Sequence, residues 1–497
     1  MAEKTIIIIG AGLAGLSTGC YARMNDYRTH IFEHRTTPGG VCTAWKRKGY
    51  TIDGCIHWLM GSKPGSSLHR IYQEVGALEG NRLIYLDHFG RLMDEASGQS
   101  LEVTADLDRL EADMKALAPE DSRVIDELLE GARACQGMDM GMGKPRELMG
   151  LLDGLKQMWH MRQLLKYAIR YNMSVDTFAE RIQNPFLRWG MTSLGLPQMP
   201  TVFLFVLLGQ LAAGDLAVVE GGSLNFSLAI ARRYRELGGE VSYGDTVEEV
   251  LVEDNRAVGV RLADGSEHRA DIVVSAADGY STIFQMLGGR YVDQTIRDRY
   301  DNWPLFQPIL IVTFGVARQF PDVPSSNTVR LQRPFTIGGQ EAGGFLFRVF
   351  NHDPTLAPEG KTVVQVLIGT DFDYWDELQK DRPRYEAEKE RVATEVLDRL
   401  EAHLPGISAQ VEMTDVATPY TFWRYTRNHR GAFEGWLMTP EMMRTHVEKA
   451  LPGLENFYMA GQWVEPGGGI PAVLPSGRQV VQILCHRDGK PFSASVP

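Results

Sequence analysis

The chain has 497 residues, a formal net charge of -12 and 44% apolar side chains. This length suffices for two or three domains with a large core, and the apolar fraction is ordinary for a globular protein. The negative charge argues against broad nucleic-acid binding. The longest apolar run, Val202 to Ala213, is too short to span a bilayer.

The five cysteines include no Cys-x-x-Cys pair, and their number is odd. These features fit reduced, structural thiols better than disulfides or a zinc site, and we expect no bound metal. The first predicted strand begins at about Lys4, which leaves no room for a signal peptide. We therefore expect a cytoplasmic protein.

The first 33 residues follow the order strand, glycine turn, helix, strand and acid. The apolar run 5–9 predicts a strand, the Gly-x-Gly-x-x-Gly pattern of 10–15 predicts a tight turn, and a helix-like run continues to Met24. A second apolar stretch, 29–32, ends at Glu33. This order is typical of a βαβ unit that holds the pyrophosphate and ribose of a dinucleotide.

Each glycine of this turn has its own physical role. Gly10 allows the tight turn, Gly12 lets the backbone approach the phosphates, and Gly15 lets the helix pack closely on the strand. The helix N-terminus supplies free N–H groups and a partial positive charge. Glu33 stands where a carboxylate can bind the ribose hydroxyls. We predict a dinucleotide site; the alternative is a glycine-rich turn in another α/β protein.

Two further glycine-rich segments indicate which dinucleotide is bound. The pair Gly39-Gly40 follows the acid closely, and a C-terminal strand ends at Gly461 before a glycine loop and a helix. Both segments resemble the FAD signatures of amine oxidase and phytoene desaturase flavoproteins. The positive end of the last helix can face the N1/C2 carbonyl edge of the flavin. The resemblance implies FAD, bound non-covalently because no cysteine or histidine stands at an attachment position in the C-terminal motif.

A third segment of the FAD site lies in the middle of the chain, within 220–278. In the flavoproteins that it resembles, the valine that matches Val247 contacts adenine through its backbone; the alternative is that Val247 is only a core strand residue. The residues predicted to bind FAD are Gly10, Gly12, Leu13, Ala14, Gly15, Glu33, His34, Gly39, Gly40, Val247, Gly461, Gln462, Gly468, Gly469, Ile470, Ala472 and Val473.

These three segments predict an α/β fold with a discontinuous Rossmann-like FAD-binding domain of the GR2 or amine-oxidase type. We assign 1–75, 220–294 and 451–497 to this domain. The remaining 76–219 and 295–450 are predicted to form an α+β substrate domain, with a mixed sheet, capping helices and a helical lid or membrane-facing region. Alternating apolar runs around 309–314, 344–347 and 362–368 predict strands of that sheet.

The chain resembles, over almost its whole length, the carotenoid desaturase and isomerase branch of the FAD amine-oxidase superfamily. This branch includes phytoene desaturases, carotene isomerases and retinol saturases. Three departures lie where the superfamily approaches the flavin. Val41 stands where arginine is common, the usual Asp-x-Gly is compressed to Asp53-Gly54, and His57-Trp58 follows. These departures do not change the predicted cofactor, but they leave the exact substrate open.

No catalytic triad, metal cluster or carboxylate pair is recognisable in the sequence. His57 is the candidate general acid or base, because imidazole titrates near neutrality; the alternative is a hydrogen-bonded structural histidine. Trp58, Trp423 and Tyr425 are candidate substrate contacts, and the alternative for them is ordinary packing. The hard step, hydride transfer, would belong to the flavin.

The segment 144–170 is locally basic in an acidic protein. Its apolar residues recur at helical spacing, and Lys156, Arg162 and Lys166 stand among them. Such a helix can enter an anionic membrane surface to collect a lipid, so the protein is expected to be cytoplasmic and possibly a peripheral membrane protein. The alternative is a core helix with a solvated face.

Three functions are open at this point. The first is an FAD enzyme that desaturates, saturates or isomerises double bonds of a lipophilic polyene, isoprenoid or related lipid. The second is an amine-oxidase-like flavoenzyme with a smaller substrate, and the third is a non-catalytic lipid-binding protein like the Rab GDP dissociation inhibitors. No second strand–Gly-x-Gly-x-x-Gly–helix unit is present, so we expect no dedicated NAD(P) domain. The oligomeric state and the electron acceptor do not follow from the sequence.

Overall fold

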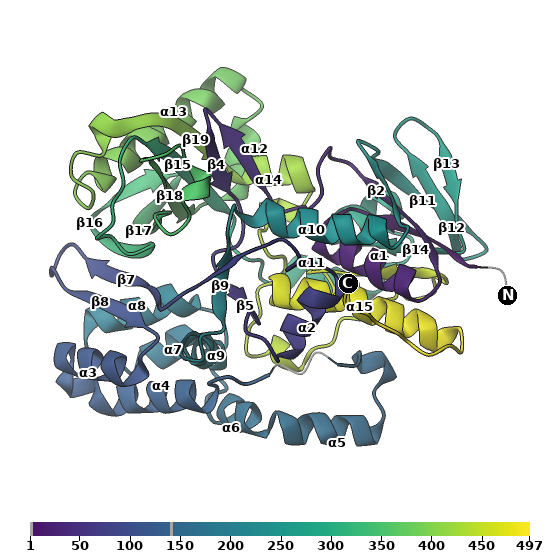
Figure 1. Cartoon of the computed structure of the whole chain (residues 1–497), viewed down its shortest axis with the longest axis horizontal. Helices are drawn as coiled ribbons and strands as arrows, with labels where there is room; N and C mark the ends of the chain where they lie inside the picture. Colours follow the sequence, from purple (N-terminus) through teal and green to yellow (C-terminus); the bar gives the residue numbers. More distant parts are fainter. Residues whose placement is uncertain (1–2, 140–142) are drawn as a thin grey trace.

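The computed structural model describes residues 3–139 and 143–497. A five-stranded sheet, with the order β10-β2-β1-β14-β20, takes strands from the start, middle and end of the chain (Figure 1). All neighbouring strands are parallel, with Ile8 of β1 opposite Ile31 of β2 and Val274 of β14. Parallel sheets are covered on both faces, which explains the continuous apolar runs. The strands are β1 (Thr5–Ile9), β2 (Arg28–Glu33), β10 (Glu240–Tyr243), β14 (Ile272–Ser275) and β20 (Phe457–Met459).

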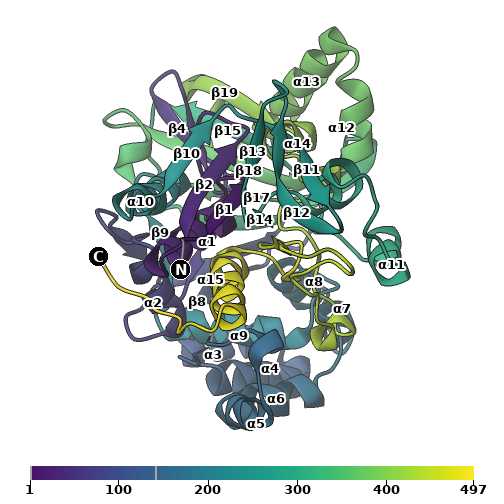
Figure 2. The ribbon, with the colours of Figure 1, turned by 90° about the vertical axis from the view of Figure 1, so that its right-hand side faces the viewer.

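Three helices, α1 (Leu13–Met24), α10 (Ser223–Glu236) and α15 (Ile470–Arg487), lie together beside this sheet (Figures 1 and 2). The helices α1 and α15 approach closely, because an ideal Cβ at Gly477 would lie 2.6 Å from the carbonyl oxygen of Ala14. The Ser17 hydroxyl also donates to the carbonyl of Leu474 at 2.7 Å. The helix that carries the first glycine turn is therefore fixed to the helix that follows the C-terminal glycine loop.

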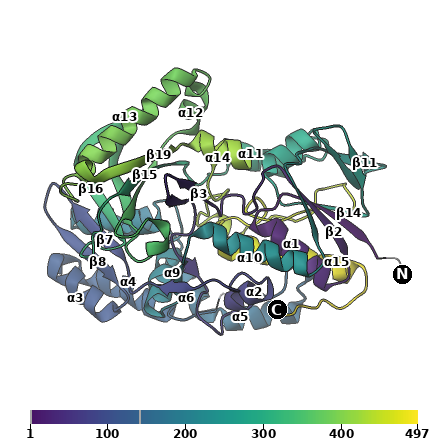
Figure 3. The ribbon, with the colours of Figure 1, turned by 45° about the horizontal axis from the view of Figure 1, so that its top comes forward.

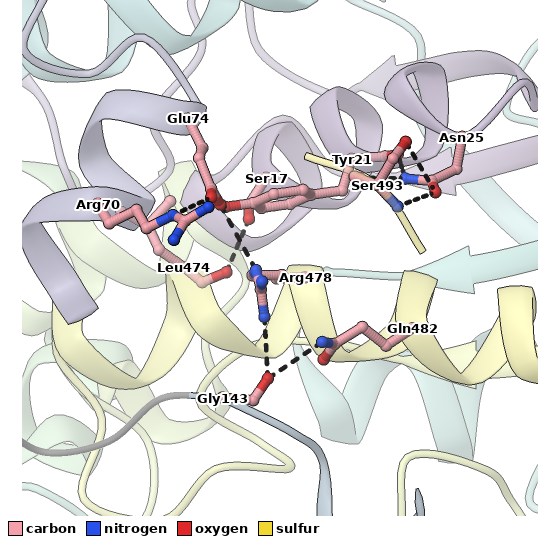
Figure 4. Close-up of polar contacts among 10 residues, drawn as sticks. All are labelled: Ser17, Tyr21, Asn25, Arg70, Glu74, Gly143, Leu474, Arg478, Gln482 and Ser493. Atoms are coloured by element: carbon pink, nitrogen blue, oxygen red, sulfur yellow. Dashed lines mark hydrogen bonds and ion pairs between the residues drawn. The ribbon is translucent and has the colours of Figure 1, made fainter. Parts of the chain in front are cut away.

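Helix α2 (Ser67–Glu74) joins this pair through the buried carboxylate of Glu74 (Figure 4). Glu74 accepts from the Tyr21 hydroxyl at 2.7 Å and forms an ion pair with Arg478 at 3.5 Å. Arg478 and Gln482 both donate to the carbonyl of Gly143, at 2.9 and 3.0 Å. The residue that precedes the basic segment is thus attached to α15.

A seven-stranded mixed sheet, with the order β19-β15-β18-β17-β16-β7-β8, joins the two insertions. Its pairs are antiparallel except for β16 and β7. Helix α13 (Arg382–Leu400) lies across one face and contributes Val392, Val396 and Leu400 to the core (Figure 3). The strands are β7 (His88–Asp94), β8 (Ser100–Thr104), β15 (Ile309–Val316), β16 (Ser326–Ile337), β17 (Gln340–Val349), β18 (Thr362–Gly369) and β19 (Val411–Ala417).

A helical layer packs below this sheet in Figure 1 and surrounds α9, the longest apolar run of the sequence. Because α9 is apolar on almost every side, all its residues from Leu204 to Leu211 are buried, whereas Phe203 is 37% exposed. The helices of this layer are α3 (Leu107–Leu117), α4 (Ser122–Ala134), α5 (Leu151–His160), α6 (Arg162–Arg170), α7 (Val175–Ala179), α8 (Pro185–Gly195) and α9 (Thr201–Ala212). In the described residues, no helix is both long enough and apolar enough to cross a membrane.

Smaller elements connect these layers. They are the hairpin β3 (Ala44–Arg47) and β4 (Tyr50–Asp53), the sheet of β5 (Leu59–Met60), β6 (Leu83–Tyr85) and β9 (Leu216–Val219), the sheet of β11 (Val247–Glu253), β12 (Arg256–Leu262) and β13 (Glu267–Arg269), and the helices α11 (Gln294–Asn302), α12 (Phe372–Leu378) and α14 (Pro419–Thr426).

The predicted α/β class with a mixed second sheet is confirmed, as are the strands expected around 309–314, 344–347 and 362–368. The basic segment 144–170 is not one helix. It divides into α5 and α6 at Met161. The exact domain boundaries stay a prediction.

Candidate functional site

A cavity of about 1100 Å³ is lined by the ends of the parallel sheet and by residues of α6, α9 and α14. All the predicted glycine segments reach it. Of the predicted FAD residues, Gly15 and Ala472 do not line it. The predicted residues that do are Gly10, Gly12, Leu13, Ala14, Glu33, His34, Gly39, Gly40, Val247, Gly461, Gln462, Gly468, Gly469, Ile470 and Val473. His57, Trp58, Trp423 and Tyr425 also line it.

The first glycine turn opens onto the cavity. Gly12 caps α1, no side chain occupies the cap, and an ideal Cβ at Gly12 would meet no atom within 4 Å. At Gly15 an ideal Cβ would instead lie 2.0 Å from the carbonyl oxygen of Gly10. Gly15 therefore serves helix packing, whereas the open space at Gly12 and the free N–H groups of the helix end suit an anionic group.

Glu33 ends β2 at the edge of the cavity. Its carboxylate accepts from the N–H of Ala11 at 2.6 Å and from the N–H of Arg35 at 2.8 Å. The side chain is buried, and burial raises its pKa above the ordinary value despite these bonds. Each carboxylate oxygen has a second lone pair, so Glu33 can hold the turn and still accept a hydrogen bond from a ligand.

The Gly-Gly pair lies against the first turn. The N–H of Gly39 donates to the carbonyl of Ala11 at 2.8 Å, and an ideal Cβ at Gly40 would lie 3.4 Å from the Cα of Gly12. Gly40 has a φ of 60°, which glycine adopts readily. The loop thus passes close to the turn without a side chain that would close the opening.

The C-terminal glycine loop presents the start of α15 to the same cavity. The three glycines 467–469 have φ values of 96°, 53° and 73°, a conformation that strongly favours glycine. The helix begins at Ile470, with Pro471 in its first turn, where a missing N–H costs nothing. The positive end of this helix faces the cavity beside Gly469 and Ile470.

The middle segment enters through the start of β11. Val247 is 5% exposed and lines the cavity beside Asp245, Thr246 and Glu248. His34 also lines the cavity, in hydrogen-bond reach of Thr246 at 3.4 Å. Burial and the nearby guanidinium groups of Arg35 and Arg427 lower its pKa, so its imidazole is neutral near pH 7 and can donate or accept a hydrogen bond.

The candidate catalytic residue His57 has an unusual electrostatic environment. Burial and the nearby Arg348 guanidinium lower its pKa to about 3. The imidazole is therefore neutral at pH 7 and is a poor proton donor there. General acid–base catalysis by His57 stays a prediction.

The aromatic candidates lie in two places. The Trp58 ring, 38% exposed, is 4.8 Å from that of Phe89. The guanidinium of Arg35 lies 4.0 Å from the centre of the Tyr425 ring, which places Tyr425 beside the end of β2 that carries Glu33. A role for Tyr425 or Trp423 in substrate binding also stays a prediction.

Four acids that line the cavity were not predicted as site residues, and two of them, Asp278 and Glu434, have raised pKa values. Asp278 follows β14 and accepts from the N–H groups of Ser281 and His429, both at 2.7 Å, and burial raises its pKa to about 6. Glu434 lies beside the C-terminal glycine loop, and burial raises its pKa to about 7. The signal for Asp278 was an acid directly after a buried strand; no sequence signal distinguished Glu434.

The other end of the cavity is apolar. Leu164 of α6 and Val202, Phe203 and Val206 of α9 line it, far along the chain from every glycine segment. The cavity volume of about 1100 Å³ lies above the range of about 300–1000 Å³ that is usual for ligand pockets.

The residues on the cavity wall fit FAD. The helix N-terminus at Gly12 would hold the pyrophosphate, Glu33 the ribose, and the start of α15 the flavin edge. The bound flavin supplies two-electron hydride chemistry. The chain's own groups provide the turn, the acceptor and the helix dipole that position it.

Comparison with known proteins gives the same cofactor. The sequence profile of the family "flavin containing amine oxidoreductase" matches residues 13–485. The chain is 23% identical to the chloroplastic prolycopene isomerase of Arabidopsis thaliana, over 97% of this chain and 82% of that protein. It is 25% identical to the lycopene-forming phytoene desaturase of Pseudescherichia vulneris, over 97% of this chain and 99% of that protein.

The fold is shared with solved structures. An oxidoreductase from Methanosarcina mazei superposes with a TM-score of 0.61 at 17% identity, over 96% of this chain and 100% of that one. Because the family profile covers almost the whole chain, the protein belongs to the flavin-containing amine oxidoreductase family and is an FAD-dependent oxidoreductase.

Proposed function

We propose that this enzyme desaturates, saturates or isomerises double bonds of a lipophilic polyene, isoprenoid or related lipid. The observation that carries the proposal is the apolar end of the cavity, where α6 and α9 supply Leu164, Val202, Phe203 and Val206. A long hydrocarbon would bury its surface there while one of its double bonds lies beside the flavin. A small polar amine would leave this end unfilled.

The relatives support the same substrate class. The names of the two enzymes above give prolycopene and phytoene as the compounds they act on. We also propose that the cavity-lining residues predicted from the sequence bind FAD non-covalently, and that 1–75, 220–294 and 451–497 act as its domain.

The experiment that tests the substrate is lipid extraction of the purified yellow protein, followed by mass spectrometry. The expected result is a co-purified polyene or isoprenoid. Anaerobic incubation of the holoenzyme with that compound should then change its double bonds or the flavin spectrum. Rapid flavin reduction by small amines, with no lipid bound and no reaction with polyenes, would contradict the proposal and favour the amine-oxidase alternative.

We further propose that α5 and α6 bind an anionic membrane surface. Helix α5 has no buried residue, and its Leu151 and Trp159 are 92% and 71% exposed. Exposed apolar surface of this extent marks an interaction site. Helices α5 and α6 lie at the edge of the molecule far from α12 and α13 (Figures 1 and 2).

The position of α6 connects this surface to the cavity. Leu164 is buried and lines the cavity, whereas Ile169 on the same helix is 72% exposed. Lys156, Arg162 and Lys166 are exposed among the apolar side chains. Cations attract acidic headgroups while the apolar side chains enter the interface. A lipid would pass from the bilayer to the cavity without crossing water.

Co-sedimentation with vesicles of mixed anionic and neutral phospholipid tests this surface. Lys156→Glu, Arg162→Glu and Lys166→Glu together should weaken binding at least about 100-fold, because each lost cation removes about 1 kcal/mol near the surface and each new carboxylate adds repulsion. The matched control reverses three exposed cations on other elements, Arg28, Lys46 and Arg384. Equal sedimentation of both triple variants, or none by the wild type, would show a helix pair with a merely solvated face.

A further inference from the structure

Glu434 places a carboxyl group against the glycine loop that begins α15. An ideal Cβ at Gly468 would lie 2.2 Å from the carbonyl oxygen and 2.6 Å from the Cβ of Glu434, and one at Gly469 would lie 3.9 Å from its Oε1. Only glycine fits this loop while Glu434 packs there. The carboxyl also lines the cavity, on the wall that the flavin edge would face.

This carboxyl has no hydrogen bond and no ion pair within residues 3–139 and 143–497. The buried acids Glu33 and Asp278 line the same cavity but accept backbone N–H groups. Glu434 is partly buried and opens to the cavity, and the surrounding apolar groups raise its pKa to about 7. A carboxyl that faces a reaction cavity and makes no hydrogen bond with the described part of the chain is a candidate for proton transfer.

The groups that surround Glu434 do not compete for the proton of its carboxyl. The loop 467–469 and the neighbours 431–433 and 435–437 carry no titratable side chain. Cys55, which follows β4, faces the carboxyl. Its thiol pKa is raised by a hydrogen bond with Cys42, by burial and by the charges of Asp53 and Glu434. Both thiols line the cavity, and the raised pKa keeps the Cys55 thiol protonated near neutrality.

Forming or saturating a carbon–carbon double bond requires a group that exchanges a proton with the substrate. Desaturation breaks two C–H bonds on adjacent carbons. One hydrogen leaves as hydride with both bonding electrons, which oxidised FAD accepts. The other leaves as a proton, and its electron pair becomes the new π bond. Saturation is the reverse, with hydride from reduced FAD and a proton from an acid. In both directions the electrons balance on the flavin and the proton needs a protein group.

We propose that Glu434 is the catalytic residue that exchanges this proton with the substrate. The inference rests on the proposed function, because it requires a substrate whose C–H or C=C bond reacts at the flavin. Its carboxylate accepts the proton in desaturation, and its carboxyl donates it in saturation. His57 lines the same cavity, but its pKa is lowered to about 3. Its imidazole is therefore neutral near pH 7 and accepts a further proton only weakly.

The test compares the wild-type holoenzyme with Glu434→Gln, Glu434→Asp and the exposed control Glu448→Gln. The first readout needs no substrate: the flavin absorbance is titrated from about pH 5 to about pH 9, where a group poised near neutrality must titrate. A spectral transition with a midpoint near 7 is expected in the wild type and in Glu448→Gln, and none in Glu434→Gln.

The second readout is the incorporation of deuterium from the solvent. The holoenzyme is incubated in heavy water with a polyene presented in vesicles, and mass spectrometry measures deuterium in the product and in the recovered substrate. Incorporation should fall about 100-fold or more in Glu434→Gln, the usual contribution of a general acid or base, and should be partly restored in Glu434→Asp. FAD content must stay at the wild-type level, which separates proton transfer from a structural role.

Two results overturn the inference: a flavin transition that persists in Glu434→Gln, or deuterium incorporation in that variant at the wild-type rate. A wild-type enzyme that reacts with no polyene contradicts the proposed function instead. In that case the flavin titration alone decides whether Glu434 is the titrating group beside the cofactor.

Discussion

The carboxylate of Glu33 accepts a hydrogen bond from the N–H of Ala11 at 2.6 Å. This bond ties the end of β2 to the first glycine turn, so the residue that we predict to bind ribose also fixes the turn that we predict to bind pyrophosphate. The two halves of the nucleotide site are therefore coupled. Loss of the carboxylate should affect both.

Glu33→Ala should raise the Kd for FAD about 10- to 100-fold. Hydrogen bonds to charged groups contribute about 1.5–3 kcal/mol, and each 1.4 kcal/mol is about tenfold in Kd. The Kd of Glu33→Gln should lie between those of Glu33→Ala and the wild type, because the amide oxygen of Gln can still accept a hydrogen bond from one N–H group. Flavin fluorescence quenching measures the Kd. Wild-type affinity in both variants would show that the ribose lies elsewhere.

Gly15→Ala and Gly12→Ala should separate folding from cofactor binding. An added Cβ at Gly15 meets the carbonyl oxygen of Gly10 at 2.0 Å, whereas at Gly12 it meets open space. We expect Gly15→Ala to lower the free energy of unfolding by about 1–3 kcal/mol, as in other overpacked sites. Gly12→Ala should unfold like the wild type in urea but bind FAD more weakly. Equal effects of the two changes on stability would refute this division.

The pH dependence of stability should reveal the half-buried, neutral His57. Its folded pKa is lowered from 6.5 to about 3, so below pH 6.5 the unfolded chain binds a proton that the folded chain does not. Its contribution to stability is full above pH 6.5 and is lost as the pH falls toward 3. At about pH 5 the loss amounts to about 2 kcal/mol.

His57→Gln should therefore lose less stability than the wild type between about pH 7.5 and about pH 5, by this same amount of about 2 kcal/mol. Urea unfolding at the two pH values measures it. His486, an exposed histidine, provides the control His486→Gln, which should follow the wild type. Parallel loss in the wild type and His57→Gln would show an imidazole that is readily protonated in the folded state.

Acid precipitation should release all the yellow colour into the supernatant. Cys485 lies late in α15 and is buried, and no cysteine or histidine occupies the glycine loop 467–469. Absorbance of the pellet and the supernatant checks the expectation. Flavin that remains in the pellet after washing would mean a covalent bond to the protein.

Anaerobic addition of NADH or NADPH should not reduce the flavin rapidly. The parallel sheet carries one glycine turn at the end of β1, and that turn is the one assigned to FAD. Stopped-flow absorbance measures the rate. Fast reduction that saturates at micromolar nicotinamide would require a second nucleotide site and would change the expected electron source.

Local signals predicted much of this molecule. A glycine required by a tight turn, an apolar run of strand length and an acid after a strand act through neighbours in sequence, so β1, α1 and β2 could be read from the chain. The C-terminal loop was predicted in the same way, since glycines 467–469 and Pro471 satisfy local backbone requirements. Strands β16 and β19 were not predicted. Apolar residues alternate only over short stretches of each strand, β16 is interrupted by an irregularity after Arg330, and pairing with strands distant in sequence stabilises both.

The sequence by itself determined the dinucleotide site and the class of fold, because backbone conformation at glycine and hydrophobic periodicity are properties of short segments. Only the tertiary structure placed Leu164 and Val206 at the apolar end of the same cavity and divided 144–170 into two helices. It also placed the Glu434 carboxyl on the cavity wall, where it makes no hydrogen bond with the part of the chain that the structure describes. Burial, the pKa of a side chain and the neighbours that satisfy it depend on residues hundreds of positions apart. These properties are set by packing between elements, and no local pattern encodes them.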